Sequence, residues 1–143
     1  MDRKSSTEYD AVAAVAMARS YLGCKWRHRG RNRFGIDCIG LIVAAVEAGG
    51  VPMNDRRDYG REPWRDGLEA AMVERFGEPV VGEWLPGDVA MMRWEIRPEA
   101  GHVGVIGGDQ HGLTLIHCHS MSCVIEHGID EHWRRLIIGV FRP

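Results

Sequence analysis

The spacing of hydrophobic residues changes once along this chain, and the change limits the folds that the chain can adopt. Up to Gly77, apolar residues recur at helical spacing, as in the stripe that runs from Ala11 to Leu22. After Gly77, apolar residues alternate with other residues, which is typical of strands. Helices first and strands later predict the α+β class, with N-terminal helices packed on a C-terminal antiparallel sheet.

Residues with capping or helix-ending preferences mark three helices before the change. The expected boundaries are Ser5 with Glu8 and Gly23 for the first helix, Asp37 and Gly49 for the second, and Asp66 with Glu69 and Gly77 for the third. Residues 23–36 and 51–65 lack a period and are interpreted as loops. The strand candidates are Val89–Trp94, His102–Ile106, Leu113–His119, Val124–Glu126 and Leu136–Phe141.

The length and charge of the chain exclude several classes of protein. The 143 residues are expected to form one domain, residues 1–143. The formal net charge of −2 gives no global basic field, so nucleic acid is not an expected partner. No stretch approaches the roughly 20 apolar residues that span a bilayer, so no membrane insertion is expected. The N-terminus lacks the apolar core of a signal peptide, which predicts that the chain carries no export address of its own.

One cysteine occupies a position that favours reactivity. Cys38 follows the capping residue Asp37, so it falls in the first turn of the second helix. Unpaired N–H groups and the positive end of the helix dipole favour a thiolate there, and they can also stabilise an oxyanion. Gly40 lacks a side chain, which permits close approach of a substrate or of a packed strand. The alternative is that Cys38 is a small buried residue on the core side of the helix.

Two histidines on successive predicted strands are candidates for the base that a thiol nucleophile needs. His102 begins one strand and His117 lies near the end of the next. A turn over residues 107–112 would make the strands antiparallel neighbours and bring the two rings side by side. Cys38, His102 and His117 would then form a triad. His119 shares a face with His117 and is the alternative third member.

A metal site is the main competing interpretation of the C-terminal histidines and cysteines. The potential zinc ligands are His117, Cys118, His119, Cys123, His127 and His132. Their spacing fits no standard zinc finger, and on a strand Cys118 faces away from its two histidine neighbours. We therefore expect no metal and no other cofactor. Without an export signal, the four cysteines are expected to be free thiols rather than disulfides.

An arginine-rich segment precedes the predicted nucleophile. It contains the cations Lys25, Arg27, Arg29, Arg31 and Arg33. Such a run is compatible with nucleic-acid binding, but few aromatic residues are interleaved with it. Because the guanidinium fork pairs with carboxylates, recognition of an acidic peptide or docking to a partner subunit is the favoured interpretation. A solvated loop is the remaining alternative.

The motifs around these residues resemble the NlpC family of papain-like cell-wall endopeptidases. The segments that carry the resemblance are Ala18-Arg19-Ser20-Tyr21-Leu22-Gly23, Gly35-Ile36-Asp37-Cys38-Ile39-Gly40-Leu41, Leu85-Pro86-Gly87-Asp88-Val89, His102-Val103-Gly104-Val105 and Leu115-Ile116-His117. Together they cover roughly residues 11 to 141. Each segment alone is a weak signal, and their order and separation make the set specific.

The resemblance implies a role for each matching residue. Cys38 would be the nucleophile, His102 the general base and His117 the polar third member, in an enzyme that hydrolyses peptidoglycan stem peptides. Trp26, Asp37 and Gly40 would border the substrate. Two residues depart from the pattern, because Trp26 stands where the family commonly has Tyr and Ile39 replaces the usual Ser. Both departures concern the substrate subsite rather than the triad.

The version of the family that the chain resembles most is the compact one of phages and gene transfer agents. The likeness lies in residues 26–31 (Trp-Arg-His-Arg-Gly-Arg) and in the ending over residues 133–143. It implies a virion protein of the tail tip, made in the host cytoplasm, that contacts tail-hub proteins and cuts peptidoglycan during DNA entry. The alternative function is a structural adaptor of the tail tip whose peptidase site is dormant or auxiliary.

Overall fold

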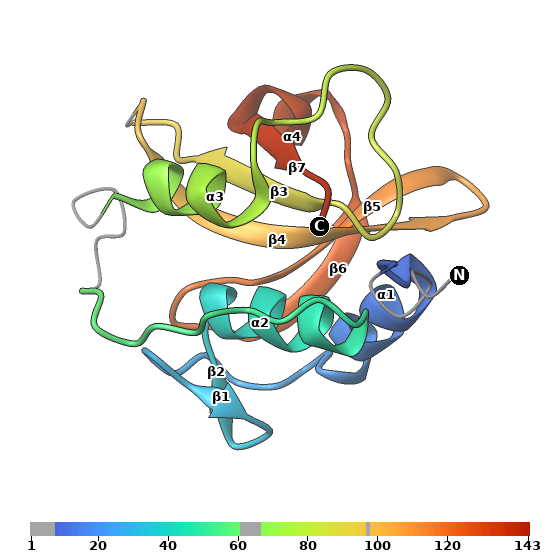
Figure 1. Cartoon of the computed structure of the whole chain (residues 1–143). Coiled ribbons are helices and arrows are strands. Elements are labelled where there is room, and N and C mark those ends of the chain that lie inside the picture. The colour runs from blue at the N-terminus through green and yellow to red at the C-terminus, as the bar shows by residue number, and fades with distance from the viewer. Residues whose placement is uncertain (1–7, 61–66, 97) are drawn as a thin grey trace, which may run out of the picture.

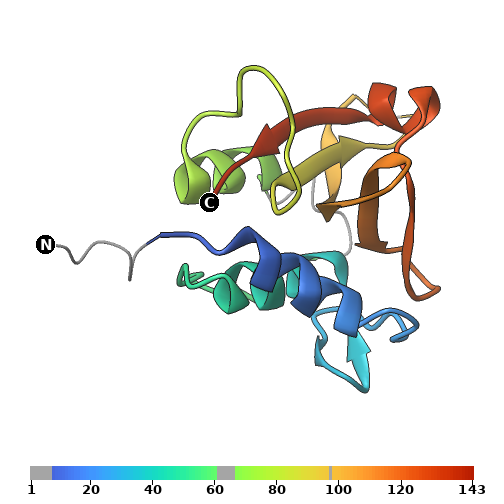
Figure 2. The same cartoon turned by 90° about the vertical axis from the view of Figure 1, so that its right-hand side faces the viewer.

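Two helices lie against one face of a five-stranded sheet (Figure 1). The structure is a computed structural model, and it describes residues 8–60, 67–96 and 98–143. Helix α1 (Ala11–Ser20) and helix α2 (Cys38–Ala48) pack on each other and on strand β4. Helix α3 (Leu68–Phe76) also contacts β4, and the short helix α4 (Glu131–Leu136) contacts the last strand. Figure 2 shows α1 and α2 together on one side of the sheet.

The sheet is antiparallel throughout and has the strand order β6-β5-β4-β3-β7. Its strands are β3 (Val89–Arg93), β4 (Ala100–Asp109), β5 (Gly112–Cys118), β6 (Val124–Gly128) and β7 (Ile137–Phe141). All five were predicted, with ends displaced by a few residues. The predicted class, α+β with N-terminal helices on a C-terminal antiparallel sheet, is therefore confirmed.

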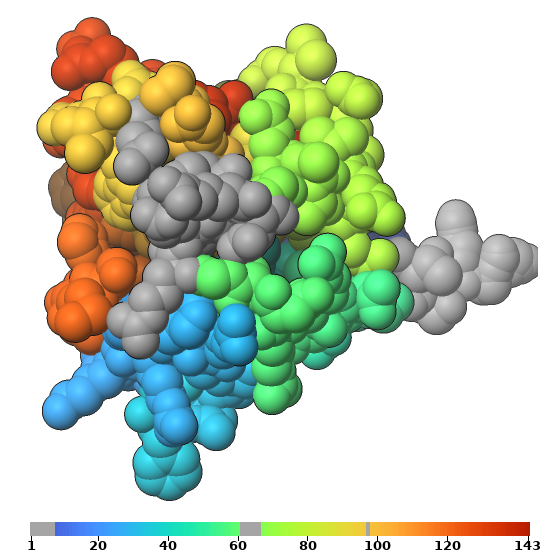
Figure 3. Space-filling view, turned by 90° about the vertical axis from the view of Figure 1, so that its left-hand side faces the viewer, coloured from blue at the N-terminus to red at the C-terminus, as the bar shows by residue number. Residues whose placement is uncertain are grey.

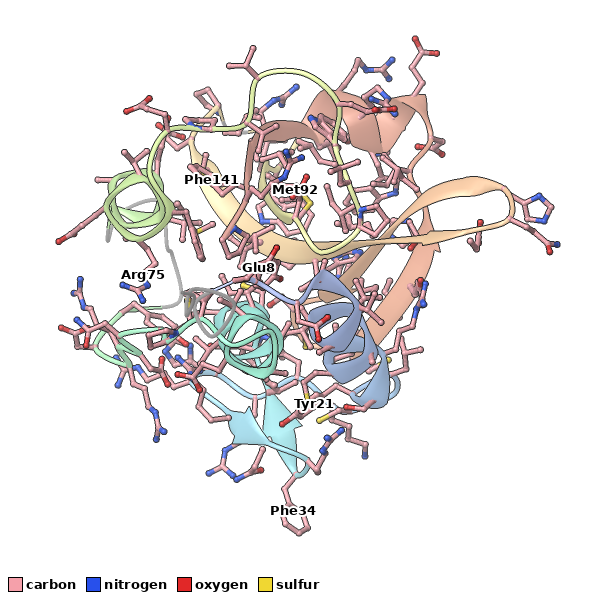
Figure 4. All side chains as sticks on the ribbon, turned by 45° about the vertical axis from the view of Figure 1, so that its right-hand side comes forward. Glu8, Tyr21, Phe34, Arg75, Met92 and Phe141 are labelled. Atoms are coloured by element: carbon pink, nitrogen blue, oxygen red, sulfur yellow. The ribbon has the colours of Figure 1, made fainter. Side chains whose placement is uncertain are left out.

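Each face of the sheet has its own hydrophobic core. Val103 and Val105 of β4 point toward α1 and α2 and join the larger cluster. Ile106 and Met92 belong to a second cluster, which the opposite face forms with residues of β7 and with Trp133 of α4. Phe141, labelled with Met92 in Figure 4, belongs to the larger cluster. The alternation along β4 thus decides which residues face the helices, as a period of two requires.

Helix starts differ from the predicted ones at two places. Asp10 caps α1, because its carboxylate accepts a hydrogen bond from the N–H of Ala13 at 3.0 Å. The predicted cap, Ser5, lies outside the described residues. Gly67, with a φ of 74°, precedes α3 without a side-chain cap. The predicted cap there, Asp66, is likewise outside the described part of the chain.

Two short elements were not predicted. A small hairpin of β1 (Arg31–Asn32) and β2 (Gly35–Ile36) interrupts the segment interpreted as a loop. Its tip carries Phe34, which projects away from the body of the protein (Figure 4) and is 89% exposed. Helix α4 precedes the last strand, and Asp130 caps it by accepting from the N–H of Trp133. One turn and a half of helix is too short to show an apolar period in sequence.

The described helices include none that is long and apolar enough to cross a membrane.

Replacing Gly40 with alanine is expected to destabilise the junction between the hairpin and α2. An added Cβ would lie 2.4 Å from the carbonyl oxygen of Gly30, which is backbone and has little room to move. We expect a loss of about 1–3 kcal/mol in the free energy of unfolding, typical of overpacking. Urea denaturation measures it. Gly128→Ala is the matched control, because its Cβ would meet open space, and an equal loss in both variants would contradict the prediction.

Candidate active site

The start of α2 is built around a buried carboxylate. Asp37 is only 4% exposed and caps the helix that Cys38 begins. Its carboxylate accepts four hydrogen bonds: from the N–H of Gly40 at 2.8 Å, the N–H of Arg29 at 2.8 Å, the guanidinium of Arg31 at 3.0 Å and the phenol of Tyr59 at 2.5 Å. These donors come from three segments of chain, so one side chain fixes the loop, the hairpin and the helix together.

The sulfur of Cys38 lies among main-chain N–H groups. The N–H groups of Val103, Ile39 and Cys38 itself point at it and act to lower the pKa of the thiol. Burial acts in the opposite direction and is the larger effect, and the neighbouring Asp37 carboxylate adds to it. Together they raise the pKa of Cys38 to about 12. The thiol is therefore protonated near neutral pH.

This protonation state corrects the expectation that the helix terminus alone favours a thiolate. The N–H groups at the start of α2 are present as predicted, but the residue that caps the helix brings a negative charge beside the sulfur. A thiolate at Cys38 would be repelled by the negative charge of the Asp37 carboxylate. A nucleophilic role for Cys38 would consequently require a base that removes the proton during attack.

The structure brings the two predicted strand histidines together. The Nε2 atom of His102, on β4, lies 2.8 Å from the Nδ1 atom of His117, on β5. Gly104 makes this approach possible, because a Cβ at that position would lie 2.9 Å from the Cβ of His117. The predicted antiparallel pairing of the two strands through residues 107–112 is present.

Burial keeps both of these rings neutral. His102 is 3% exposed, and Trp94 stacks on it with ring centroids 4.8 Å apart. Burial, together with the charge of nearby His119, lowers the pKa of His102 to about 3. Burial and the three neighbouring histidines lower the pKa of His117 to about 2. A neutral imidazole has a free lone pair, which a general base requires.

A third ring continues the pair, and the sequence analysis considered it only as a potential zinc ligand. The Nε2 atom of His127, on β6, lies 2.8 Å from Nε2 of His117. Trp133 of α4 covers both rings, at centroid distances of 4.7 Å to His127 and 5.1 Å to His117. The register of β5 and β6, which pairs Leu115 with His127, creates this contact. The predicted strand ended at Glu126, so it did not include His127, which lies on β6 in the structure.

His119 and the potential zinc ligands have their own surroundings in the structure. His119, the alternative third member, does not bond His102; its Nδ1 lies 3.3 Å from the carbonyl of Ser120. Cys118 faces the helix side and donates to the carbonyl of Ile36. Within the described residues, no three histidine, cysteine or acidic side chains are grouped as metal ligands. All four cysteines are free.

The remaining residues expected at the substrate site lie in different surroundings. Asp37 is buried and bonded to the N–H of Arg29, and Gly40 packs against the carbonyl of Gly30. In the structure both residues therefore join the loop to helix α2. Trp26 is half-buried, and its ring centroid lies 6.4 Å from that of His28. The backbone of Trp26 forms a bridge with Ile36, which lies just before helix α2.

Much of the arginine-rich segment is committed to the fold. Arg29 donates to the carbonyl of Tyr59, and Arg31 pairs with Asp37 and Asp55. The guanidinium of Arg33 lies 3.7 Å over the ring of Tyr21. In the space-filling view of Figure 3, residues 51–60 lie directly beside this segment. The expected peptide-binding or docking role therefore has to compete with internal pairing for these three arginines.

A hollow opens beside the first turns of α2. It has a volume of about 340 Å³ and lies between α2, α3 and residues 53–59. Ile39, the residue after Cys38, forms part of its wall, together with other apolar side chains of α2 and α3. Ile39, which departs from the pattern described in the sequence analysis, thus gives this hollow part of its apolar edge.

Solved structures with the same fold are NlpC/P60 proteins. An NlpC/P60 family protein from Bacillus cereus superposes with a TM-score of 0.67 at 20% identity, over 92% of this chain and 39% of that one. NlpC1 from Trichomonas vaginalis gives 0.67 and 20%, over 99% of this chain and 45% of that one. The NlpC/p60 domain of the peptidoglycan hydrolase SagA gives 0.64 and 16%, over 93% of this chain and 98% of that one.

These likenesses establish the fold of the chain. It spans less than half of the first two proteins but almost the whole of the SagA domain. No protein-family model and no curated protein sequence matches the chain. The chain therefore has the papain-like fold of NlpC/P60 proteins, with the nucleophile candidate at a helix N-terminus beside an antiparallel sheet.

The buried histidines predict a loss of stability in acid. The unfolded chain binds protons at His102 and His117 below pH about 6.5, whereas the folded chain does not bind them until far lower pH. As the pH falls below about 6.5, each histidine should lower the free energy of unfolding by about 1.4 kcal/mol per pH unit. Above pH about 6.5 neither histidine should make the free energy of unfolding depend on pH. Urea midpoints at pH 7.5, 6 and 5 measure this. His117→Gln should reduce the slope and His111→Gln should not; equal slopes in all three proteins would refute the assignment.

Proposed function

We propose that this chain is a cysteine peptidase that hydrolyses the stem peptides of peptidoglycan. The observation that carries the proposal is the position of Cys38, at a helix N-terminus and in contact with the N–H of Val103. Val103 directly follows His102, whose neutral ring is bonded to His117. The thiol thus contacts the main chain of the strand that also carries a neutral imidazole, and an imidazole is the base that a thiol-dependent peptidase needs.

The proposed reaction begins with a neutral thiol and a neutral base. Nδ1 of His102 takes the proton from Cys38 as the sulfur attacks the peptide carbonyl, and the N–H groups at the start of α2 hold the oxyanion. The resulting imidazolium protonates the leaving amine, which departs with the C–N bond broken. Water, deprotonated by His102, then attacks the thioester carbonyl; the C–S bond breaks, the peptide leaves as a carboxylic acid, and the proton taken from water passes from His102 to the sulfur of Cys38. In resting enzymes the hydrogen bond between nucleophile and base often shortens only when substrate binds.

The choice of peptidoglycan rests on two kinds of likeness. The five sequence segments described above resemble those of cell-wall endopeptidases, and the chain shares its fold with the NlpC/p60 domain of a peptidoglycan hydrolase. That domain is also similar in extent to this chain. The hollow beside Ile39 is available for the part of the stem peptide that flanks the cleaved bond.

Removal of the nucleophile should abolish release of peptides from cell walls. Purified sacculi are incubated with the wild type and with Cys38→Ala, and soluble muropeptides are measured by chromatography and mass spectrometry. We expect release by the wild type and only background release by Cys38→Ala. Cys24→Ala is the matched control, because Cys24 is also partly buried and free but lies outside the site, and it should retain activity.

Equal release by the wild type and Cys38→Ala would refute the nucleophile assignment. Absence of release from all three proteins would refute the peptidase function for the isolated chain and favour the alternative of a structural adaptor.

The proposed place of action is the tail tip of a virion or gene-transfer particle. Its support is the sequence likeness over residues 26–31 and 133–143. An enzyme at that place would cut the wall during DNA entry and would contact tail-hub proteins. Antibodies against the chain should label one end of the tails in purified particles. Labelling confined to the soluble fraction of the producing cells would contradict this location.

A further inference from the structure

Three histidine rings form a continuous chain of hydrogen bonds across three strands. His102 on β4 bonds His117 on β5, and His117 bonds His127 on β6, each at 2.8 Å between ring nitrogens. His127 in turn places its Nδ1 2.9 Å from the carbonyl oxygen of Gly128. Every contact uses a different nitrogen, so the three rings are linked in series and end on a peptide group.

The carbonyl at the end of the chain fixes its direction. A carbonyl oxygen can only accept, so Nδ1 of His127 carries the hydrogen and Nε2 of the neutral ring is an acceptor. Nε2 of His117 must then donate to it, which leaves Nδ1 of His117 as an acceptor. Nε2 of His102 therefore donates, and the remaining nitrogen of that ring, Nδ1, keeps its lone pair.

The direction matters because the two inner rings are neutral. The pKa of His102 and that of His117 are both far below the usual value for histidine, so neither ring is expected to carry two protons near neutral pH. The reactivity of His102 then depends on which nitrogen holds its single proton. With a hydrogen on Nδ1 the ring could not accept a proton there from a thiol.

We propose that His127, anchored on the carbonyl of Gly128, is a positioning residue that sets the tautomers of His117 and His102 and so leaves Nδ1 of His102 free to act as the base. Its function in catalysis rests on the peptidase activity proposed above. A doubly protonated His127 would have the opposite effect, because its Nε2–H would donate to His117 and reverse both bonds.

The surroundings of His127 hold it in this arrangement. Its ring packs on Trp133 at an angle of 39° between the ring planes, and the same tryptophan packs on His117. His117 is fully buried, so His127 supplies the acceptor that its Nε2–H would otherwise lack. Helix α4 thus covers the rings of His117 and His127 with its Trp133 side chain.

Tautomers can be read directly from the protein without substrate. Long-range ¹H–¹⁵N spectra of protein labelled with ¹⁵N-histidine distinguish a protonated from an unprotonated ring nitrogen, and single histidine variants assign the signals. The wild type should show hydrogen on Nε2 of His102, on Nε2 of His117 and on Nδ1 of His127. A hydrogen on Nδ1 of His102 in the wild type would overturn the proposal, even if no variant folds.

A pair of similar side chains at position 127 tests the cause. His127→Met removes the acceptor, whereas His127→Gln restores an oxygen near the position of Nε2. In His127→Met we expect mixed tautomers at His102 and a loss in kcat of about tenfold or more, with KM little changed. His127→Gln should restore most of the wild-type tautomer at His102 and most of the wild-type kcat. His111→Met, in the exposed turn between β4 and β5, is the matched control and should change neither.

The results separate this inference from the peptidase function. Unchanged tautomers and unchanged kcat in His127→Met would overturn the role of His127 while leaving the peptidase standing. The expected tautomers in a wild type that releases nothing from sacculi would support the chain of rings and contradict the peptidase function.

Discussion

The buried carboxylate of Asp37 is the interaction on which the rest of this structure depends. A negative charge removed from water must be matched by donors, and four of them converge on Asp37 from three parts of the chain. One donor caps α2, another holds the loop before it, and the side chains of Arg31 and Tyr59 bring in the hairpin and residues 51–60. The position of Cys38 follows, because it is the next residue and the first of the helix.

The same carboxylate also decides the chemistry available at the site. By standing beside Cys38 it opposes a resting thiolate, and burial opposes it further. Burial likewise opposes a resting imidazolium at His102. Both partners therefore begin uncharged, which resembles a serine hydrolase more than a thiolate–imidazolium pair. In the proposed reaction charge develops only during attack, when the N–H groups around the sulfur, including that of Val103, can stabilise it.

The sequence predicted the parts of this site that depend on local signals. A capping residue followed by Cys38, and alternating residues around His102 and His117, were enough to place the triad candidates on a helix and two neighbouring strands. His127 was missed because its contact depends on the register between β5 and β6, which short strands do not specify in sequence. Arg31 was predicted to take part in recognition of an acidic peptide or a partner subunit, and its internal pairing was missed because Asp37 and Asp55 are close to it only in the folded chain.

Neutral rings explain why a series of histidines suits a buried site. A carboxylate beside His117 would orient it as well, but it would add a buried negative charge that needs donors of its own. A neutral histidine orients its neighbour without adding charge. By itself it can either donate or accept the hydrogen bond between the two rings, because both tautomers are available to it. The direction must come from a group with no alternative state, and a backbone carbonyl is such a group. Ending the series on Gly128 therefore gives His102 a defined lone pair without adding a buried charge.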